Sequence, residues 1–521
     1  MIKRVLFLLF SINVMCYAQI STEIFWEPTI DLSQTGDNTT LPRVAINENY
    51  QGLCVWEATV AANRVIQASY WNGTSWSSSA HTFPGTDDAV NPRVAFNDNN
   101  QGVCDWINYD GVNYTLQLSF WDGSSWSVPE ILHTSAPQIF LCDVGIDNNN
   151  NVIATWTVNV GGNFVVQTRY WNGSIWDAVQ NLSDPLNSTG EMSLIMNKNG
   201  EALCSWLGIN WPNTFIEAAI YNGSTWLAKQ VLSDPAVLPQ DVQEFYMDIN
   251  QNGEALVSWT RYDGANYIIK YSFWNKASWS SSSSINAPAG IVDPTYGRIA
   301  LNNNDQAVCV YYGELGPNTN LYASFWNGSE WVSYPSSIST IGEDIGEPSV
   351  VLHDNGEAVA IWKSDNGVSQ PIVFSLYNGS SWSTNQNLSE SSSNTGTPDL
   401  ALNNSGRIIS AWYEEEGAFW RTKSKNGQLQ LIYSPSSKKY STSLLLQKDY
   451  VNKLTWDPVE NAGYYKVYLN SLSNLIFSGG TPYFYHHGIN KNETYTYYLS
   501  WIDKNTSAES IPMKITVSPS E

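Results

Sequence analysis

Short apolar runs alternate with clusters of Asn, Asp, Ser and Gly along most of the chain. Residues 92–96 (Pro-Arg-Val-Ala-Phe) and 102–106 (Gly-Val-Cys-Asp-Trp) are two such runs, separated by a polar stretch, and residues 114–121 form a third. Short apolar runs bounded by turn-forming residues predict β-strands, and the polar stretches between them predict hairpins. The pattern therefore predicts an all-β protein.

This strand pattern repeats about every 50 residues. The hexapeptide at residues 71–76, Trp-Asn-Gly-Thr-Ser-Trp, returns with small changes at 121–126, 171–176, 221–226, 274–279, 326–331 and 377–382. A second aromatic residue, the inner aromatic, stands 20 residues before the end of each hexapeptide and once more in a final repeat: Trp56, Trp106, Trp156, Trp206, Trp259, Tyr311, Trp362 and Trp412. Such a period, with four predicted strands in each repeat, is typical of a β-propeller blade.

Two turns recur in each repeat. The position six residues before the inner aromatic is Tyr50, Asn100, Asn150, Gly200, Gly253, Asp305, Gly356 or Gly406. Seven of these eight residues tolerate a positive φ, which a tight turn requires. In the hexapeptide, a dipeptide such as Asp122-Gly123 predicts a two-residue type I′ hairpin.

The number of repeats predicts how the structure closes. Eight first strands begin near Val44, Val94, Val144, Leu194, Met247, Ile299, Val350 and Leu400. The eighth repeat lacks its final Trp, whereas Trp26 stands alone 50 residues before Trp76. We therefore expect an eight-bladed propeller in which the N-terminal strand completes the last blade and leaves no free sheet edge. The alternative is seven blades, and residues 428–433 could supply the closing strand instead.

The repeat stops near Ser441, and the remaining segment has its own strand pattern. An early Trp456 and a late strand at 494–499 resemble a fibronectin type III domain, with Tyr495 at the place of its tyrosine corner. The resemblance implies an Ig-like β-sandwich over residues 439–521, after a propeller over 19–438.

The N-terminus and the charge indicate where the protein works. Residues 1–18 combine a basic start, an apolar run and a small-residue cleavage site, which predicts a signal peptide and a secreted, cell-surface or periplasmic protein. Whether Cys16 is lipidated stays open. The chain has 48 acidic and 25 basic residues, so its net charge of -23 argues against nucleic acid or an anionic membrane as a partner. No later segment predicts membrane insertion.

Five cysteines remain after the predicted cleavage. Cys54, Cys104, Cys204 and Cys309 all stand two residues before the inner aromatic, so they occupy equivalent places in different repeats. Equivalent places in neighbouring blades lie too far apart for a disulfide bond. We expect buried free thiols, including Cys142.

Variable loops are the favoured place for a binding site. The loops between the second and third strands, and the links between repeats, differ in length and content, and they share one end of the propeller, which we call the variable face. The other hairpins share the opposite end, which we call the turn face. Trp211 and Trp420 fall in variable loops, where an aromatic ring either stacks on a sugar or folds back onto its blade.

Charged residues at the start of the first strands form a second candidate site. Arg43, Arg93 and Arg298 occupy one position of different repeats and are similar to the carboxylate-binding arginines of sialidases. Asp143 and Asp399 occupy the same position, so a purely structural ring of charges is the alternative reading.

The hexapeptide is also similar to the Asp-box of sialidases. Ser69, Gly73 and Trp76 match its Ser, Gly and Trp, but Trp71 stands where the Asp belongs. The Asp-box is a fold-stabilising turn, so the resemblance implies a blade and no catalysis.

The chain thus resembles secreted β-propeller repeat proteins of bacterial type. We expect an exported, non-enzymatic recognition protein that binds cell-surface carbohydrate or protein through the variable face, with several weak equivalent sites as in propeller lectins. The alternative is a sialidase-like glycoside hydrolase, for which no acid pair is marked by spacing. No catalytic residue, metal ligand or cofactor site is predicted, and the oligomeric state stays open.

Overall fold

The computed structural model describes residues 21–517, except 61–62, 85–87, 137, 211–212, 234–240, 316–317, 433–437, 445–446, 456–461, 472–473, 482, 488, 491–492 and 505–512. Strands are the regular secondary structure throughout this part of the chain. Among the residues described, no helix has the length and hydropathy to cross a membrane. The predicted signal peptide, including Cys16, lies outside the described residues. The chain divides into two compact units, one of residues 24–429 and the other containing residues 430–521.

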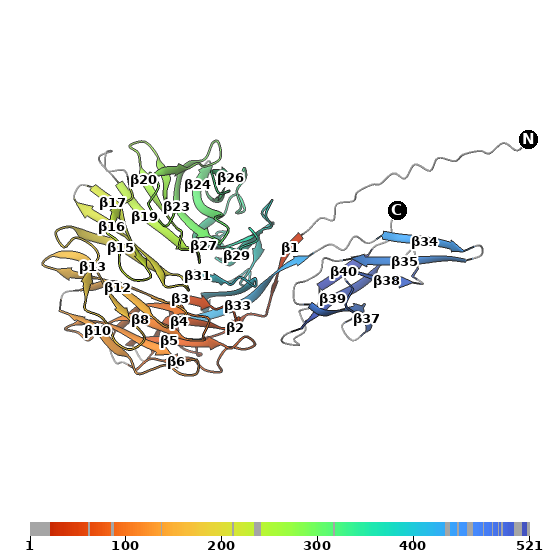
Figure 1. The fold of residues 1–521 in the computed structure, drawn as a ribbon, viewed down its shortest axis with the longest axis horizontal. Coiled ribbons are helices and arrows are strands. Elements are labelled where there is room, and N and C mark those ends of the chain that lie inside the picture. The colour runs from red at the N-terminus through yellow and green to blue at the C-terminus, as the bar shows by residue number, and fades with distance from the viewer. Residues whose placement is uncertain are drawn as a thin grey trace, which may run out of the picture. The chain divides into compact units, whose positions relative to one another are not determined.

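The larger unit is built from repeated antiparallel sheets, and seven of them have four strands in chain order (Figure 1). The first three sheets contain β3 (Asn38–Ile46), β4 (Gly52–Val60), β5 (Asn63–Trp71), β6 (His81–Thr82); β7 (Asp88–Phe96), β8 (Gly102–Tyr109), β9 (Tyr114–Trp121), β10 (Glu130–Ser135); and β11 (Ile139–Ile146), β12 (Val152–Val160), β13 (Asn163–Trp171), β14 (Gln180–Asn181). The fourth and fifth contain β15 (Ser188–Met196), β16 (Glu201–Asn210), β17 (Asn213–Asn222), β18 (Gln230–Val231); and β19 (Asp241–Ile249), β20 (Ala255–Tyr262), β21 (Tyr267–Trp274), β22 (Ser283–Ile285). The sixth and seventh contain β23 (Val292–Leu301), β24 (Ala307–Leu315), β25 (Asn318–Trp326), β26 (Trp331–Ser333); and β27 (Asp344–Leu352), β28 (Ala358–Asp365), β29 (Ile372–Tyr377), β30 (Gln386–Asn387).

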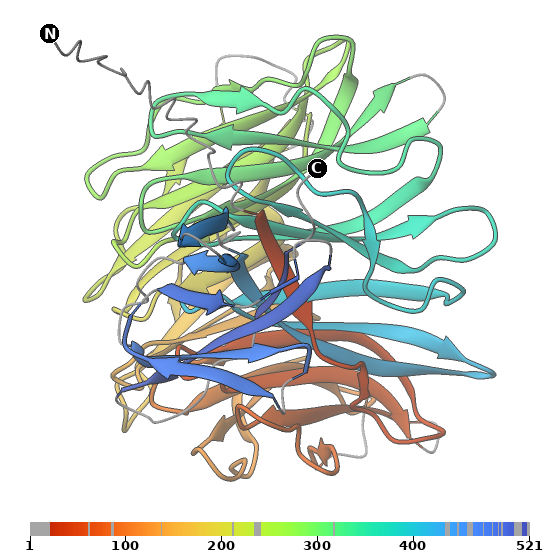
Figure 2. The same ribbon diagram turned by 90° about the vertical axis from the view of Figure 1, so that its right-hand side faces the viewer.

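The eighth sheet joins segments from both ends of the larger unit. It contains β31 (Thr395–Leu402), β32 (Arg407–Glu416) and β33 (Phe419–Ile432), and both β1 (Ser21–Trp26) and β2 (Ile30–Asp31) pair with β33. Trp26 of β1 packs edge-to-face on Phe374 with ring centroids 5.3 Å apart. The first sheet contacts this last sheet through β3 against β31 and β32, as Figure 2 shows where the red and light-blue strands adjoin. Such repeated four-stranded sheets fit a β-propeller.

The core of the larger unit lies between neighbouring sheets, and the repeating aromatics fill it. All eight inner aromatics are almost completely buried. Cys54, Cys104, Cys204 and Cys309 each pair with one first-strand residue at the same register, for example Val44 with Cys54 and Leu194 with Cys204. These four thiols and Cys142 are buried and free, as predicted.

The first hairpin turn of every sheet has a residue with positive φ at the predicted position, which confirms that prediction. Tyr50 adopts φ 59° although bulky side chains disfavour this region. Its ring packs on Trp71 and under the Arg407 guanidinium, 4.6 Å from the ring centroid, and its hydroxyl bonds Glu27. Packing between the first and last sheets therefore holds Tyr50 in a strained backbone conformation.

The type I′ prediction for the hexapeptide turn is wrong. Trp121 bridges Trp126, so four residues form the loop, and of these the structure places Gly123 at positive φ but not Asp122. The Asp122 carboxylate instead accepts hydrogen bonds from the amides of Ser124 and Ser125. A side chain that caps its own loop amides replaces the second left-handed residue that a type I′ turn would need.

The turn face also carries hydrogen bonds from each sheet to the next. The Asn residue that opens the first turn accepts bonds from amides of its own turn, as Asn97 does from Asn99 and Gln101. Its side-chain amide then donates to the main chain of the following turn in six cases: Asn47 to Asn97 O, Asn97 to Asp147 O, Asn197 to Asn250 O, Asn250 to Asn302 O, Asn302 to His353 O, and Asn403 to Asn47 O. His353 makes the seventh link through Nε2 to Asn404 O, and the main-chain amide of Asn148 makes the eighth by donating to Lys198 O. We call this series the turn ring.

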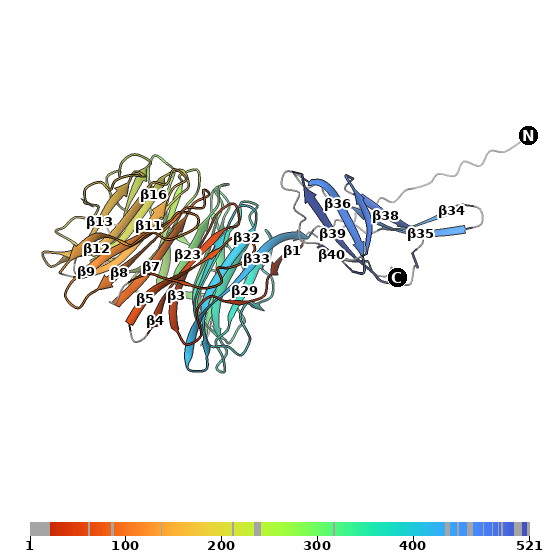
Figure 3. The same ribbon diagram turned by 90° about the horizontal axis from the view of Figure 1, so that it is seen from below.

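The smaller unit has two sheets around its own core (Figure 3). One sheet has the order β34 (Lys438–Leu444), β35 (Gln447–Thr455), β38 (Tyr483–His487). The other has the order β37 (Leu475–Gly479), β36 (Ala462–Leu469), β39 (Tyr495–Asp503), β40 (Met513–Val517). Leu454, Val467, Tyr497 and Leu499 meet between the two sheets and are almost completely buried.

Candidate functional site

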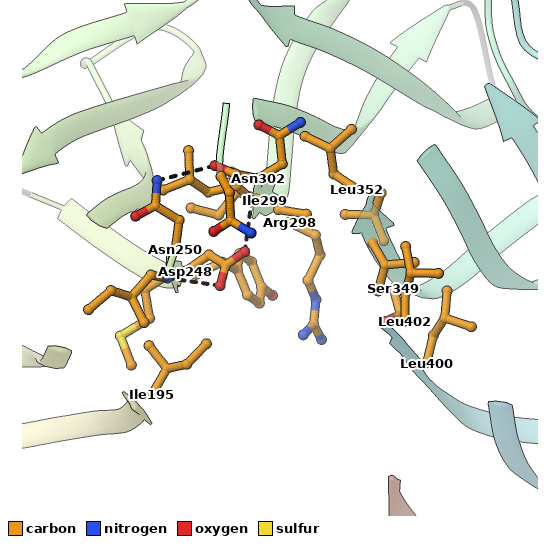
Figure 4. Close-up of a pocket in the computed structure, with 18 of the residues that line it drawn as sticks. Ile195, Asp248, Asn250, Arg298, Ile299, Asn302, Ser349, Leu352, Leu400 and Leu402 are labelled. Atoms are coloured by element: carbon orange, nitrogen blue, oxygen red, sulfur yellow. Dashed lines mark hydrogen bonds between the residues drawn. The ribbon is translucent and has the colours of Figure 1, made fainter. Parts of the chain in front are cut away.

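A cavity of about 530 Å³ lies where the first strands of several sheets converge. Strands β3, β15, β19, β23, β27 and β31 all contribute lining residues, so the cavity lies along the inner edges of the sheets. At the turn face its rim includes Glu48, Lys198, Asp354 and Asn404. Figure 4 shows Arg298 pointing into this space between the aliphatic side chains of Ile195, Leu352 and Leu402.

The predicted ring of charges exists, but its three arginines have different surroundings. Arg93 lies 4.0 Å from Asp143. Asp143 also accepts bonds from the Leu194 amide and the Ser193 hydroxyl, and burial raises its pKa. For Arg43, burial and the neighbouring Arg93 lower the pKa to about 10, while the carboxylate of Asp399 acts in the opposite direction. Arg43 and Arg93 thus belong to a charge network in which carboxylates balance cations.

Neither Arg298 nor Arg43 has a carboxylate of the described residues within ion-pair distance, and Arg298 differs from the other two arginines in the group that its guanidinium contacts. Its guanidinium lies 4.2 Å from the centroid of the Tyr246 ring. Its Nε atom is buried and has no hydrogen-bond partner among the described residues. A guanidinium held on an aromatic face and directed into a cavity is available to bind an anionic or hydroxyl-bearing group.

Asp248 is the second ionisable group of the cavity. Burial raises its pKa to about 7. The backbone amides of Leu301 and Ile249 donate to its carboxylate and partly oppose this rise, because they favour the charged form. The group is half-buried and lies on β19, the neighbour of β23, which carries Arg298. Near neutral pH it exists as a mixture of acid and carboxylate.

Lys198 spans the rim of the cavity at the turn face. Its ammonium group bonds the Phe96 carbonyl of the second sheet and lies 3.9 Å from Asp98. Burial lowers its pKa, and Asp98 and Glu48 act against that change. Lys198 therefore links the fourth sheet to the second across the rim.

Trp420 and Trp211 were the aromatic candidates of the variable face. Trp420 is half-buried and packs edge-to-face on Tyr413, and its main-chain amide and carbonyl bond Asn38 and Thr39. Its backbone therefore ties the eighth sheet to the first. Trp211 lies outside the described residues.

Two hairpins of the variable face share a motif that the sequence analysis missed. The second-to-third loops of the second and fifth sheets read Tyr-Asp-Gly-x-Asn-Tyr, at residues 109–114 and 262–267. The tyrosines of each loop pair across the strands, with ring centroids 4.5 Å apart for Tyr109 and Tyr114 and 5.2 Å for Tyr262 and Tyr267. We call them the tyrosine hairpins. The repeated motif was the signal that could have found them.

The Asp residue of each tyrosine hairpin fixes its loop. The carboxylate of Asp110 accepts bonds from the Val112 and Asn113 amides, which lower its pKa. Asp263 makes the same two bonds to the residues at the equivalent places of its loop. The two loops are therefore built alike, and each holds a tyrosine pair at the end of its strands.

Among the described residues, no group of three or more His, Cys, Asp or Glu could hold a metal ion.

The chain matches no protein-family model and no curated protein. Similar solved structures include an ulvan lyase of polysaccharide lyase family PL25 (9% identity, TM-score 0.45, 76% of this chain and 95% of that one). They also include an intramolecular trans-sialidase from Ruminococcus gnavus (10%, 0.33, 64% and 94%) and a subtype N10 neuraminidase-like protein of A/little yellow-shouldered bat/Guatemala/060/2010 (11%, 0.36, 67% and 97%).

Proposed function

We propose that this chain is an exported, non-enzymatic recognition protein that binds carbohydrate through its variable face. The observation that carries the proposal is the pair of tyrosine hairpins, at the same place in two different sheets. A single loop of this kind would be weak support for a binding site, whereas the same loop in two sheets offers two equivalent sites. Weak equivalent sites that engage one polymer together bind it far more tightly than either does alone.

The chemistry of the tyrosine hairpins favours a sugar over a purely apolar ligand. Each tyrosine offers an aromatic face, which matches the C–H face of a pyranose ring, together with a polar hydroxyl. The exposed loop that joins the two rings contains Asp and Asn, whose side-chain oxygens accept hydrogen bonds from sugar hydroxyls. The Tyr109 hydroxyl already donates to the Gly111 carbonyl, which orients the ring before a ligand arrives.

A glycan array tests the proposal. We expect the labelled full-length protein to bind a defined set of glycans, and the Tyr109→Ala/Tyr114→Ala variant to lose at least tenfold in apparent affinity, since two stacking contacts and one of two sites are removed. Ile175→Ala is the matched control, because Ile175 is an exposed side chain in a turn-face loop. Binding unchanged in the hairpin variant would contradict the proposal. Silence on the array with capture of a surface protein would favour a protein ligand.

We further propose that the eight sheets are the eight blades of one ring that β1 and β2 close. The pairing of both strands with β33, the contact of β3 with β31 and β32, and the bond from Asn403 to Asn47 support closure. On this proposal the propeller covers residues 19–438, and cleavage of residues 1–18 delivers it to the cell surface, the periplasm or the medium.

We also propose that residues 439–521 form a fibronectin type III domain. Three- and four-stranded sheets packed face to face support this assignment. The tyrosine corner gives a more specific argument. The Asn490 main-chain amide donates to the Tyr495 hydroxyl over 2.8 Å, a bond to the backbone a few residues upstream of a tyrosine at the start of its strand.

One observation favours a glycoside hydrolase as the second candidate function. Arg298 and the partly protonated Asp248 line the same cavity, and a carboxylic acid that titrates near neutral pH is suited to general acid catalysis. A panel of chromogenic glycosides tests this candidate. Turnover that disappears in Asp248→Asn and Arg298→Gln but survives in the tyrosine-hairpin variant would establish an enzyme and remove the non-enzymatic proposal.

A further inference from the structure

The smaller unit differs in charge from the rest of the chain. Residues 430–521 hold 8 Lys and Arg against 7 Asp and Glu, whereas the preceding residues hold 17 against 41. The acidic excess of the protein therefore lies in the larger unit. The smaller unit has a nearly neutral composition, so charge repulsion does not keep acidic ligands from it.

One strand of this unit exposes aromatic rings at every second position. Tyr483, Tyr485 and His487 of β38 are all exposed, with 46% and 42% of the surface of the two tyrosines accessible. Their ring centroids are 5.9 Å and 6.4 Å apart, so the three rings form a continuous row along the strand. Strand β38 pairs with β35 on one side and is an edge of its sheet. We call this row the aromatic stripe.

The core of the unit does not account for the aromatic stripe. The intervening residues of β38 point to the other face, where Phe484 packs on Phe477 and joins the core cluster. His486, also on that face, bonds the hydroxyl of the buried Tyr497. Alternation along the strand thus places one set of rings at the core and leaves the other set partly exposed on the opposite face. Rings exposed together in this way indicate a surface that is covered by a ligand.

The size of the aromatic stripe decides which ligand it fits. An aromatic side chain offers about 200 Å² of surface, so three rings exposed to about 40% present roughly 250 Å². A stable protein interface needs about 800 Å² on each partner, about three times as much. A row of rings on one strand is instead long and narrow, like an oligosaccharide. We propose that the aromatic stripe is a second carbohydrate-binding site, which takes a soluble glycan chain laid along β38.

The angles between the rings support a soluble chain over a flat polymer surface. The planes of Tyr485 and His487 are 35° apart, whereas Tyr483 is turned by 71° from Tyr485. The stripe is therefore stepped, and a flat crystalline face would touch one or two rings. A single twisted chain presents successive sugar rings at different angles and stacks on each ring in turn. The tyrosine hydroxyls add hydrogen bonds at the border of the row.

Affinity electrophoresis of the full-length protein tests this site. The protein is run in native gels that contain barley β-glucan, xylan, glucomannan or alginate, and the dissociation constant is obtained from the retardation at several polymer concentrations. We expect retardation by at least one polymer, and a 5- to 100-fold weaker affinity in Tyr483→Ala/Tyr485→Ala, since two stacking contacts are lost. Tyr464→Ala is the matched control, because Tyr464 is 40% exposed on β36 of the other sheet.

The outcomes separate this site from the one proposed on the variable face. Reduced retardation in the stripe variant, with normal retardation in Tyr464→Ala and in Tyr109→Ala/Tyr114→Ala, supports the aromatic stripe even if the variable face binds no sugar. A circular dichroism melt that matches the unaltered protein excludes loss of folding, and Tyr483→Phe/Tyr485→Phe, which keeps the rings, should restore most of the retardation. No retardation by any of the four polymers, or equal retardation of the stripe variant and the unaltered protein, would overturn the proposal.

Discussion

The contact between Trp26 and Gly427 gives a direct test of how the N-terminal segment completes the eighth sheet. A Cβ atom added at Gly427 would lie 2.6 Å from Cε3 and 2.9 Å from Cζ3 of Trp26. The indole cannot simply move away, because Phe374 packs against it and the surrounding cluster is buried. We therefore expect Gly427→Ala to overpack this site and to destabilise the larger unit by about 2 kcal/mol.

The same substitution should cost nothing once Trp26 is absent. Replacement of a core Trp by Ala costs about 3–5 kcal/mol, and Trp26 is half-buried, so we expect about 2–3 kcal/mol for Trp26→Ala. In that background the space above Gly427 is empty except for Ile24, and Ala is favoured over Gly in a strand by roughly 0.5–1 kcal/mol. The two substitutions should therefore be coupled by about 2–3 kcal/mol.

Urea unfolding at 25 °C, followed by circular dichroism for the protein, both single variants and the double variant, measures this coupling. Gly346→Ala is the matched control, since its added Cβ would meet the flexible side chain of Lys363 at 3.1 Å. Additive free energies in the double variant would refute the placement of Trp26 over Gly427. A neutral Trp26→Ala would refute the role of the N-terminal strand in closing the ring.

Three further perturbations test the charged and polar groups of the larger unit. Stability should fall as the pH rises from about 4 to about 7, because folding raises the pKa of Asp248 and disfavours its charged form. The rise in the pKa of Asp248 corresponds to about 4 kcal/mol at 1.36 kcal/mol per pKa unit. Because the carboxyl group is partly exposed to solvent, we expect a smaller loss of stability, about 1–2 kcal/mol. Urea titrations at several pH values measure this loss, which should be absent in Asp248→Asn. For His353, burial lowers the pKa but bonds to Glu357 and the Asn404 carbonyl raise it overall, so stability should fall as the pH rises from 6.5 through that raised value. His353→Asn should flatten this step in thermal melts. Asn403→Ala should cost about 2–4 kcal/mol in urea unfolding because buried bonds to two turns are lost, and an equal loss in the exposed Asn49→Ala would contradict this reasoning.

The sequence predicts the individual sheet well because its signals are local. Apolar alternation marks the strands, and the inner aromatics and the residues with positive φ recur at fixed distances along the chain. Even Tyr50, the residue that does not suit its turn, occupies the same backbone conformation as the other seven. The type I′ assignment failed because an Asp at this place can either adopt a positive φ or accept hydrogen bonds from the loop amides through its side chain. Asp122 does the second.

Contacts between sheets were beyond prediction for a physical reason. The Asn residues of the turn ring bond residues 50 to 53 positions away, and Asn403 bonds one 356 positions away. Nothing in the local sequence therefore separates such an Asn from one that bonds its own turn alone. The groups that the three arginines contact likewise depend on residues of neighbouring sheets. Arg93 gains Asp143, whereas Arg298 gains the face of Tyr246, although spacing assigned both to one position.

The turn ring also gives a reason for binding to concentrate at the opposite end of the sheets. The Asn of each such turn accepts bonds from the amides of its own turn and donates to a carbonyl of the next turn, so a changed residue there leaves buried polar groups unpaired in two sheets at once. The second-to-third loops also bond neighbouring sheets in places, as Trp420 does to Asn38 and Thr39, but their length and sequence differ from sheet to sheet. Against that variation, the recurrence of Tyr-Asp-Gly-x-Asn-Tyr in the second and fifth sheets is not required by the fold, since the other sheets close the same loop with different residues. The recurrence of a feature that folding does not demand supports the proposal that a ligand contacts these loops.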